Sequence, residues 1–219
     1  PPSAPPHPRR PIDQNEVTET STEPTNSGSW TDSGNYDTTF AGGTGTESDP
    51  YLISTARQLA GLAYNVNNGT NYSGVYFLQT ANIDLSAYWW TPIGSSSSIY
   101  FAGLYDGGKY TISGLFTQSG SESYSGLFGY TLGTSSSHAE ITNVGIVDSN
   151  IQGRQYTGAV IGNANYTDIS NCHNTGTVNT GDFVGGIVGY LYINSSISNC
   201  YNTGNISSST SYANVGGIA

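Results

Sequence analysis

The sequence contains no methionine and only two cysteines, Cys172 and Cys200. Two cysteines are too few for a disulfide-stapled scaffold, and their number and spacing do not fit a zinc site. Basic residues are also scarce, because five Lys and Arg stand against fifteen Asp and Glu, a formal net charge of −10. That field repels polyanions, so nucleic acid is not an expected partner. No apolar run reaches the roughly 20 residues that cross a bilayer, and no membrane span is predicted.

The beginning of the chain shows no positively charged segment followed by an apolar stretch. We therefore expect position 1 to be a processing site or an arbitrary cut, with any export signal outside this sequence. Charged residues make up only 9% of the chain, so solubility depends on neutral polar side chains and on tyrosine hydroxyls. Such a composition is typical of extracellular and surface-layer proteins.

Proline divides the chain into two parts. Seven of the nine prolines lie within residues 1–24, and aliphatic residues are scarce until about Tyr51. Such a segment cannot bury enough apolar surface to order itself, so residues 1–45 are predicted to be a Pro/Thr/Ser-rich linker or a disordered or extended arm, which could also dock on another chain. The 35% apolar content of the chain supports one elongated domain over residues 46–219.

One helix is predicted, in the segment STARQLAGLAYNVNNG at 54–69. Thr55 and Gln58 form a capping box, and an apolar face at Leu59, Leu62, Ala63 and Val66 gives helical periodicity over residues 55–66. Asn68 and Gly69 end it. We expect this helix to cap the domain at its N-terminal end.

Repetition dominates the rest of the chain. Ile83, Ile112, Ile141, Ile169 and Ile197 are separated, by subtraction, by 29, 29, 28 and 28 residues, and ISNCHNTGTV at 169–178 matches ISNCYNTGNI at 197–206. A repeat of about this length with two or three short strands predicts one coil of a β-helix. The predicted fold is therefore an all-β, right-handed parallel β-helix, or β-solenoid. A propeller or sandwich is the alternative, although propeller blades are longer, at roughly 40 to 50 residues.

Equivalent residues of successive coils should stack about 4.8 Å apart. The predicted inward ladders are Ile169 on Ile197, Val178 on Ile206, and Ile187 on Ile161 or Val160; the predicted amide ladders are Asn171 over Asn199 and Asn174 over Asn202. Cys172 and Cys200 should stack in the same way as small buried hydrophobic residues. A disulfide between them is disfavoured, because in-register parallel neighbours point their Cβ bonds in the same direction.

Short glycine-rich strands recur as SGLFG at 125–129, GAVIG at 158–162 and GGIVG at 185–189. They resemble the GLUG motif, a repeat of bacterial cell-surface, adhesin-like proteins. The preceding segments DPYLISTARQLAGLA, ANIDLS, WTPIG and FAGLYDGGKYTISGL are similar to those that introduce such coils, so the resemblance covers residues 43–219, with GLUG-type coils from about 100 to 219. It implies an accessory or display role, and the family has no catalytic residues to carry over.

The residues themselves indicate no catalytic, cofactor or metal site. The acids after residue 50 share no evident repeat phase, and His7, His138 and His173 form neither a metal set nor a triad. Asp84 and Asp106 are interpreted as structural residues that cap turns, although a calcium site at them is left open. Asn-X-Ser/Thr sequons occur at Asn68, Asn71, Asn165, Asn194 and Asn205, as expected by chance in this composition.

Tyr88, Trp89 and Trp90 form an aromatic cluster that either fills the core near the helix or stacks on sugar rings. The chain ends at GGIA, inside an expected core strand, which suggests a fragment of a longer protein or an open end that docks on another copy.

The leading functional hypothesis is a non-catalytic, adhesin-like or stalk module outside the cell. Its expected partner is a host or cell-surface glycan or protein, or a further copy of itself. The alternatives are the subunit of a filament that assembles head to tail and a carbohydrate-binding β-helix. The last would gather aromatic or acidic side chains in one external groove.

Overall fold

The structure, a computed structural model, describes residues 23–118, 120 and 122–219. One helix and twenty-one short strands follow one another in these residues. Every pairing between named strands is parallel, and the strands align into five sheets. Within this part of the chain, no helix is long and apolar enough to cross a membrane.

Each coil contributes at most one strand to each sheet. The longest sheet contains β1 (Tyr51–Ile53), β2 (Tyr76–Gln79), β4 (Leu104–Asp106), β8 (Ala139–Thr142), β13 (Thr167–Ser170) and β18 (Ser196–Ser198). The second contains β3 (Ile83–Asp84), β5 (Thr111–Ser113), β9 (Gly145–Val147), β14 (His173–Asn174) and β19 (Tyr201–Asn202). The third contains β10 (Asn150–Gln152), β15 (Thr177–Asn179) and β20 (Ile206–Ser207).

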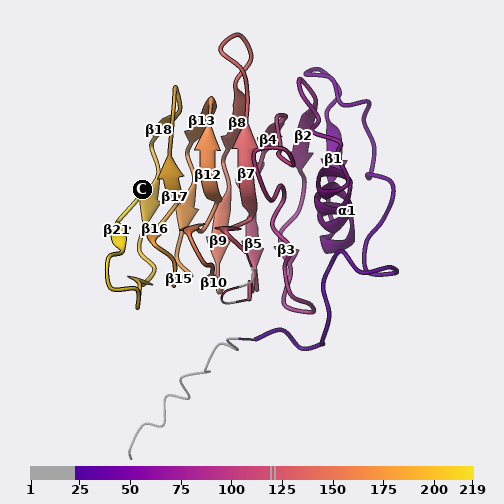
Figure 1. Cartoon of the computed structure of the whole chain (residues 1–219). Helices are drawn as coiled ribbons and strands as arrows, with labels where there is room; N and C mark the ends of the chain where they lie inside the picture. The colour runs from indigo at the N-terminus through magenta and orange to yellow at the C-terminus, as the bar shows by residue number, and fades with distance from the viewer. Residues whose placement is uncertain (1–22, 119, 121) are drawn as a thin grey trace, which may run out of the picture.

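The other two sheets carry the glycine-rich motifs. One contains β6 (Tyr124–Ser125), β11 (Tyr156–Gly158), β16 (Phe183–Gly185) and β21 (Asn214–Gly216), and the other contains β7 (Phe128–Leu132), β12 (Ile161–Asn165) and β17 (Val188–Leu191). The coils stack side by side from α1 at one end to β21 at the other (Figure 1). The predicted parallel β-solenoid is confirmed.

A repeated corner explains how short strands turn into a coil. Asn143, Asn171 and Asn199 each follow a strand of the longest sheet and adopt φ values of 57°, 55° and 53°. Asparagine tolerates this left-handed conformation better than most residues with a side chain. The backbone N–H of Asn143 and Asn171 donates to Ser170 and Ser198 of the next coil, at 3.0 and 3.1 Å. These asparagines share a corner, but no hydrogen bond joins the side chains of Asn171 and Asn199 in the described residues.

The helix α1 (Ala56–Asn67) follows the prediction closely, and its four apolar residues are buried. The Thr55 side chain accepts a hydrogen bond from the Gln58 backbone N–H at 3.2 Å. The returning bond of the capping box is shifted by one residue, because Gln58 Oε1 accepts from the Ser54 N–H at 2.8 Å. Asn68 and Gly69 end the helix, with Gly69 at φ 101°.

Residues 23–45 are not a linker, and this part of the predicted arm is corrected. The N–H groups of Thr25, Asn26 and Trp30 donate to the backbone of residues 86, 87 and 89 at 3.0 Å each. The Trp30 ring is 6% exposed and donates its indole N–H to Leu85 at 2.8 Å. A single large aromatic side chain therefore anchors a polar segment that composition alone assigns to a linker. The rest of the predicted arm, residues 1–22, lies outside the described residues.

The five regularly spaced isoleucines belong to two ladders instead of one. Ile83 pairs with Ile112, which pairs with Ile146. Ile141 lies in a different sheet, where it pairs with Tyr105 on one side and Ile169 on the other, and Ile169 pairs with Ile197. This coil has longer connections, so the ladder partner of Ile112 is Ile146, 34 residues later. Counting 29 residues from Ile112 leads instead to Ile141, which belongs to a different sheet.

The remaining predicted ladders are largely present. Val178 pairs with Ile206, and the Asn174 amide donates to Asn202 Oδ1 at 2.7 Å. Ile161 pairs with Val188, whereas Ile187 lies next to Val160 and Ile161 through hydrogen bonds of 3.0 and 3.1 Å to its carbonyl. Aromatic rings fill the early coils, since Phe101 contacts both Phe77 and Phe128. Aliphatic side chains fill the later coils.

Candidate functional site

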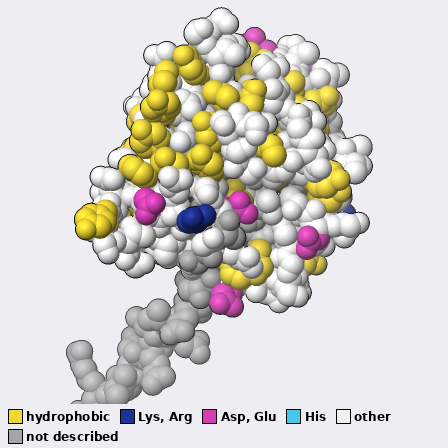
Figure 2. Space-filling model, viewed as in Figure 1, with side chains coloured by type: hydrophobic (Ala, Val, Ile, Leu, Met, Phe, Trp, Pro, Cys, Tyr) yellow, Lys and Arg dark blue, Asp and Glu magenta, His cyan; other side chains and the backbone are white. Residues whose placement is uncertain are grey.

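A group of aromatic side chains, all but the buried Tyr130 at least partly exposed, gathers over β6, β7, β11, β16 and β17. We call it the tyrosine face, and its members are Tyr124, Tyr130, Tyr156, Phe183, Tyr190 and Tyr192. On the side of the molecule that carries β17, hydrophobic side chains form a continuous patch above a basic side chain (Figure 2). The carbohydrate-binding hypothesis requires an external gathering of this kind.

The first row of the tyrosine face comes from strand register. Tyr156 pairs with Tyr124 on one side and Phe183 on the other. The rings therefore stack, with centroids 5.3 Å apart at 14° for Tyr124 and 5.1 Å apart at 23° for Phe183. The next residue along β11, Thr157, is fully buried, so the alternation of side chains along the strand turns Tyr156 outward.

The second row lies on the neighbouring sheet, where Asn163 pairs with Tyr130 and Tyr190. Tyr190 joins the two rows, because its ring centroid lies 5.2 Å from that of Tyr156 and 5.3 Å from that of Phe183. Tyr192 extends the face by stacking on Tyr190 at 5.5 Å. Between the rings, Asn163 is 6% exposed and its Oδ1 has no hydrogen-bond partner in the described structure.

The tyrosine hydroxyl groups add hydrogen-bonding groups to this apolar surface. Tyr130 accepts a hydrogen bond from the Asn165 amide at 2.8 Å. For Tyr124, Tyr156, Tyr190 and Tyr192, the described residues offer no hydroxyl partner, and Tyr192 is 45% exposed. Burial, followed by the nearby tyrosines, raises the pKa of Tyr124 and Tyr156, so both phenols stay protonated at neutral pH. The face therefore offers aromatic rings together with hydroxyl groups that are able to donate hydrogen bonds.

The aromatic cluster at residues 88–90 separates into three environments. Trp90 is 3% exposed and donates its indole N–H to Leu127 at 3.0 Å, so it fills the core. Tyr88 packs edge-on against Trp30 with centroids 5.2 Å apart. Trp89 instead lines an external hollow together with Asp32 and Glu122. The core-filling interpretation is thus confirmed for Trp90, while sugar stacking stays a prediction for Trp89.

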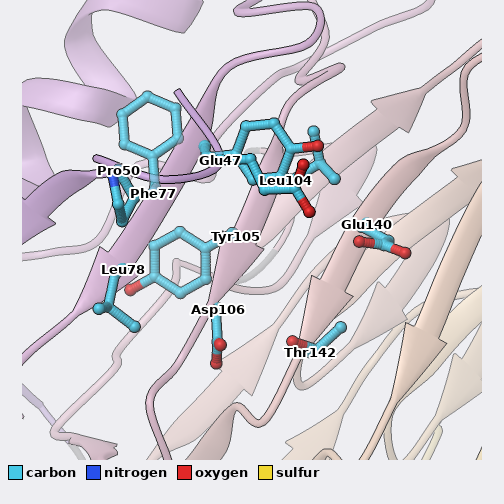
Figure 3. Close-up of a pocket in the computed structure, with 10 residues that line it drawn as sticks. Glu47, Pro50, Phe77, Leu78, Leu104, Tyr105, Asp106, Glu140 and Thr142 are labelled. Atoms are coloured by element: carbon cyan, nitrogen blue, oxygen red, sulfur yellow. The ribbon is translucent and has the colours of Figure 1, made fainter. Parts of the chain in front are cut away.

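A second hollow, of about 320 Å³, lies over β2, β4 and β8 (Figure 3). Its carboxylates are Glu47, Asp106 and Glu140.

The expectation that no acids share a repeat phase is wrong, because Glu140 pairs directly with Asp168 of the next coil. The parallel register places like charges side by side, which a sequence alignment by isoleucine spacing does not reveal. Even so, the described residues contain no group of three or more His, Cys, Asp or Glu that could hold a metal ion.

The other acidic and histidine residues have local partners. Asp84 accepts from the Ser86 N–H, and Asp106 from the Gly108 N–H, each at 2.8 Å, in agreement with their predicted turn-capping roles. His138 Nδ1 lies 2.9 Å from Asp168 Oδ2. His173 stacks on Tyr201, with centroids 5.1 Å apart. His7 lies outside the described residues.

Cys172 and Cys200 stack in adjacent coils, as predicted, and both are free thiols. Cys172 is fully buried, whereas Cys200 is half-buried and its Sγ accepts from the Cys172 N–H at 3.4 Å. The hydrogen bond between the two thiols, followed by burial, raises the pKa of Cys172. The same bond lowers the pKa of Cys200 to about 7. Cys200 is therefore the more reactive thiol.

The predicted sequons differ in accessibility. Asn165 is 9% exposed and its amide is bonded to Tyr130, whereas Asn68, Asn194 and Asn205 are exposed and Asn71 is half-buried. An attached glycan at Asn165 would break that bond and displace the tyrosine face. The surface of the fold therefore offers acceptor positions at only some of these asparagines.

Comparison with known proteins agrees with the coil boundaries. Residues 153–179 and 184–207 match the model of the GLUG motif. The first match runs from just before β11 to the end of β15, and the second runs from β16 to β20, so each corresponds to one coil. The solenoid carries the GLUG motif. The resemblance inferred from the sequence is thereby confirmed, while SGLFG at 125–129 lies outside the matched residues.

Two relatives are similar to parts of this chain. A protein named as a Gly-rich membrane protein from Evansella cellulosilytica is 40% identical over 98 residues, which is 41% of this chain and 10% of that protein. Halomucin from Haloquadratum walsbyi is 33% identical over 156 residues, which is 67% of this chain and 2% of halomucin. The chain thus spans a small part of each relative. A crystal structure named as an immunoglobulin A1 protease from Bacteroides ovatus aligns with a TM-score of 0.49 and 19% identity, over 81% of this chain and 77% of that one.

Sequence reasoning misses the tyrosine face. Tyrosine is abundant, at seventeen residues, but the six members of the face fall in three different coils and in two sheets. The available signal is the aromatic residue two positions before the first glycine of each motif, at Tyr124, Tyr156 and Phe183. Those three positions align once the motifs SGLFG, GAVIG and GGIVG are superimposed on that glycine.

Proposed function

We propose that this chain is a non-catalytic, adhesin-like module of an extracellular surface protein, and that its β-solenoid presents the tyrosine face to a cell-surface or host glycan. The observation that carries the proposal is the clustering of six aromatic rings, of which those of Tyr124, Tyr156, Tyr190 and Tyr192 carry hydroxyl groups without a partner in the described residues. A soluble domain that used these rings only for packing would bury them inside the coil, as it does Phe77, Phe101 and Phe128.

The chemistry of tyrosine suits a glycan. Its ring offers a flat apolar body to the C–H groups of a sugar, and its hydroxyl bonds to sugar hydroxyls. Tyrosine also loses little conformational entropy on binding, since only two side-chain torsions become fixed. Here the rings are already held by mutual contacts of 5.1 to 5.5 Å, so the face is preorganised.

The whole chain fits an extracellular setting. A composition with 9% charged residues and net charge −10 favours neutral polar contacts and disfavours nucleic acid. The relatives named halomucin and Gly-rich membrane protein support a surface location for the module, because each matches a part of this chain. Stacked coils also supply a rigid support for display, since each coil contacts its neighbours along its full width.

A glycan array probed with the full chain tests the proposal, followed by titration of the strongest ligand. We expect Tyr192→Ala and Tyr156→Ala each to weaken binding about tenfold or more, as for aromatic residues at the centre of a binding surface. Tyr110→Ala is the matched control, because Tyr110 is 39% exposed and lies outside the tyrosine face. Equal affinities for all three variants, each with an unchanged melting temperature, would exclude the tyrosine face as the binding surface.

A further inference from the structure

We propose a second sugar-binding site in the hollow beside Trp89, which we call the tryptophan hollow. It encloses about 410 Å³ and is lined by Ser27, Gly28, Ser29, Asp32, Trp89, Trp90, Thr91, Gln118 and Glu122. Its residues come from the N-terminal segment, from the turn after β3 and from the connection before β6, so only the folded chain brings them together. The proposal goes beyond the tyrosine face and does not depend on it.

Trp89 differs from the other two tryptophans in a way that packing does not explain. The indole N–H groups of Trp30 and Trp90 donate to backbone carbonyls at 2.8 and 3.0 Å, and both rings are buried. The Trp89 ring is half-buried, and its indole N–H has no partner in the described part of the chain. An indole with an accessible ring and an open donor is suited to a ligand that offers both C–H groups and oxygen acceptors.

The backbone holds Trp89 in position without using its side chain. Its N–H donates to Gly28 at 3.1 Å, and its carbonyl accepts from Trp30 at 3.0 Å. Gly28 and Trp30 thus fix Trp89 from the adjacent segment, in which Ser29 forms a parallel bridge with Trp89. The backbone at Trp89 is thus already ordered before a ligand stacks on the ring, which reduces the entropic cost of binding.

The polar part of the hollow is also ordered. Asp32 Oδ2 accepts from the Ser29 N–H at 2.7 Å. Gly28 makes this possible, because its φ is 100° and an added Cβ would lie 2.8 Å from Asp32 Oδ2. The hydroxyls of Ser29, Thr31 and Thr91 lie within 2.6 to 3.1 Å of one another, and each hydroxyl is able to act as donor or acceptor.

These groups define the class of ligand. An indole ring that shares a hollow with carboxylates and hydroxyls suits a pyranose ring, whose C–H face stacks on the indole while its hydroxyls donate to the carboxylates. Two carboxylates, Asp32 and Glu122, add attraction for an ammonium group and repel a sugar acid. The tryptophan hollow is therefore a site for neutral hexosides and, more strongly, for amino sugars with a free ammonium, and it rejects uronic and sialic acids.

Tryptophan fluorescence of the full chain provides a direct test, because two of its three tryptophans are buried. Acrylamide quenching reports mainly on Trp89. We expect glucosamine oligosaccharides to protect it saturably, neutral gluco-oligosaccharides to do so at several-fold higher concentration, and oligogalacturonate or sialyllactose to have no effect. Absence of saturable protection by any of these probes overturns the proposal.

Variants separate this site from the tyrosine face. Trp89→Ala should weaken glucosamine-oligosaccharide binding, measured by calorimetry, at least tenfold. Glu122→Gln should reduce the preference for the amino sugar over the neutral sugar several-fold while the ring still stacks. Tyr110→Ala, at a 39% exposed position outside both surfaces, should leave both affinities unchanged. Unchanged glucosamine-oligosaccharide binding in Trp89→Ala would overturn the tryptophan hollow, and a loss in Tyr192→Ala instead would assign that binding to the tyrosine face.

Discussion

At the scale of single residues, polar side chains inside the coils stabilise the corners through short loops of hydrogen bonds. Asn174 is fully buried, its Oδ1 accepts from the Gly176 N–H at 3.0 Å, and its amide donates to the Gly176 carbonyl at 3.0 Å. In the next coil, Asn202 repeats the contact with the Gly204 carbonyl at 2.9 Å, but it is only half-buried. The two residues thus differ in burial and in the acceptor role of Oδ1, since Asn202 Oδ1 accepts from the Asn174 amide at 2.7 Å.

Asn174→Ala should therefore destabilise the chain more than Asn202→Ala. The first change leaves the buried Gly176 N–H and carbonyl unpaired, at a cost of about 2–4 kcal/mol. Asn202→Ala leaves the Gly204 carbonyl accessible to water, which replaces the lost hydrogen bond, so this change should cost about 1 kcal/mol. Urea unfolding followed by circular dichroism measures both. Equal losses would show that solvent does not reach the Asn202 corner.

The two thiols give a residue-scale test of pH dependence. The hydrogen bond from Cys172 lowers the pKa of Cys200 to about 7, below its ordinary value of roughly 8.5. Alkylation of Cys200 by iodoacetamide should therefore rise with pH to half its maximum near pH 7, while Cys172 stays unmodified in the native chain. Peptide mass spectrometry across pH 5 to about 9 reads out each thiol separately.

Cys172→Ala provides the control, because it removes the largest cause of the shift. The half-maximal pH of Cys200 should then move upward, toward that of the unfolded chain. A native midpoint that already coincides with the unfolded midpoint would contradict the thiol–thiol hydrogen bond.

At the scale of elements, the segment before the first strand behaves as part of the solenoid. Residues 25, 26 and 30 donate backbone hydrogen bonds to residues 86, 87 and 89, and Ser29 forms a parallel bridge with Trp89. Arg57 of α1 also reaches this segment, through an ion pair with Asp37 at 2.8 Å. The pair is exposed, so apolar burial of Trp30 is the larger contribution to the docking of this segment.

Trp30→Ala should release this segment from the coil. Removing a buried tryptophan costs roughly 3–5 kcal/mol and also leaves the Leu85 carbonyl without its donor. Hydrogen exchange should then accelerate at the amides of Thr25 and Asn26, while amides of β13 and β14 remain protected. Thr25→Ala, at an exposed position, serves as the control with little change. Unchanged exchange in Trp30→Ala would mean that the backbone bonds alone hold the segment.

At the scale of the whole molecule, the coil is the unit of stability. No single coil of the described residues closes a core, because each strand finds its backbone partners in the coils before and after it. Register is uniform across the later coils, since Tyr156 pairs with Phe183 and Ile169 with Ile197. Removal of a whole coil should therefore leave the remaining strands in register, whereas removal of part of a coil should not.

Deletion of residues 156–182 removes one 27-residue coil, as the pairing of Tyr156 with Phe183 defines it. Tyr124 should then face Phe183 and Ile141 should face Ile197, so the chain should unfold in one transition at a lower urea concentration. Deletion of residues 156–169 is the control, because it removes about half a coil and places strands opposite corners. A folded half-coil deletion would contradict the register as the source of stability.

How much of this protein follows from the sequence differs between its parts. The helix at 56–67 is predictable because capping and apolar periodicity are local properties. The solenoid is predictable because its later coils repeat at nearly constant length, which makes equivalent residues visible. The isoleucine ladder is assigned wrongly where one coil is longer, because a constant spacing in the sequence does not show which sheet a residue belongs to.

The binding surfaces required the tertiary structure. The tyrosine face combines residues of three coils and two sheets, and the tryptophan hollow combines segments about 30 to 90 residues apart along the chain. Which aromatic rings face outward depends on strand register, and Trp30 became a core residue only because residues 24–30 lie along residues 86–89. The sequence by itself determined the helix, the coil and the scarcity of charged residues, since these depend on local pattern and composition. The folded chain decided which side chains meet, because contact depends on the loops that set each coil in register with the next.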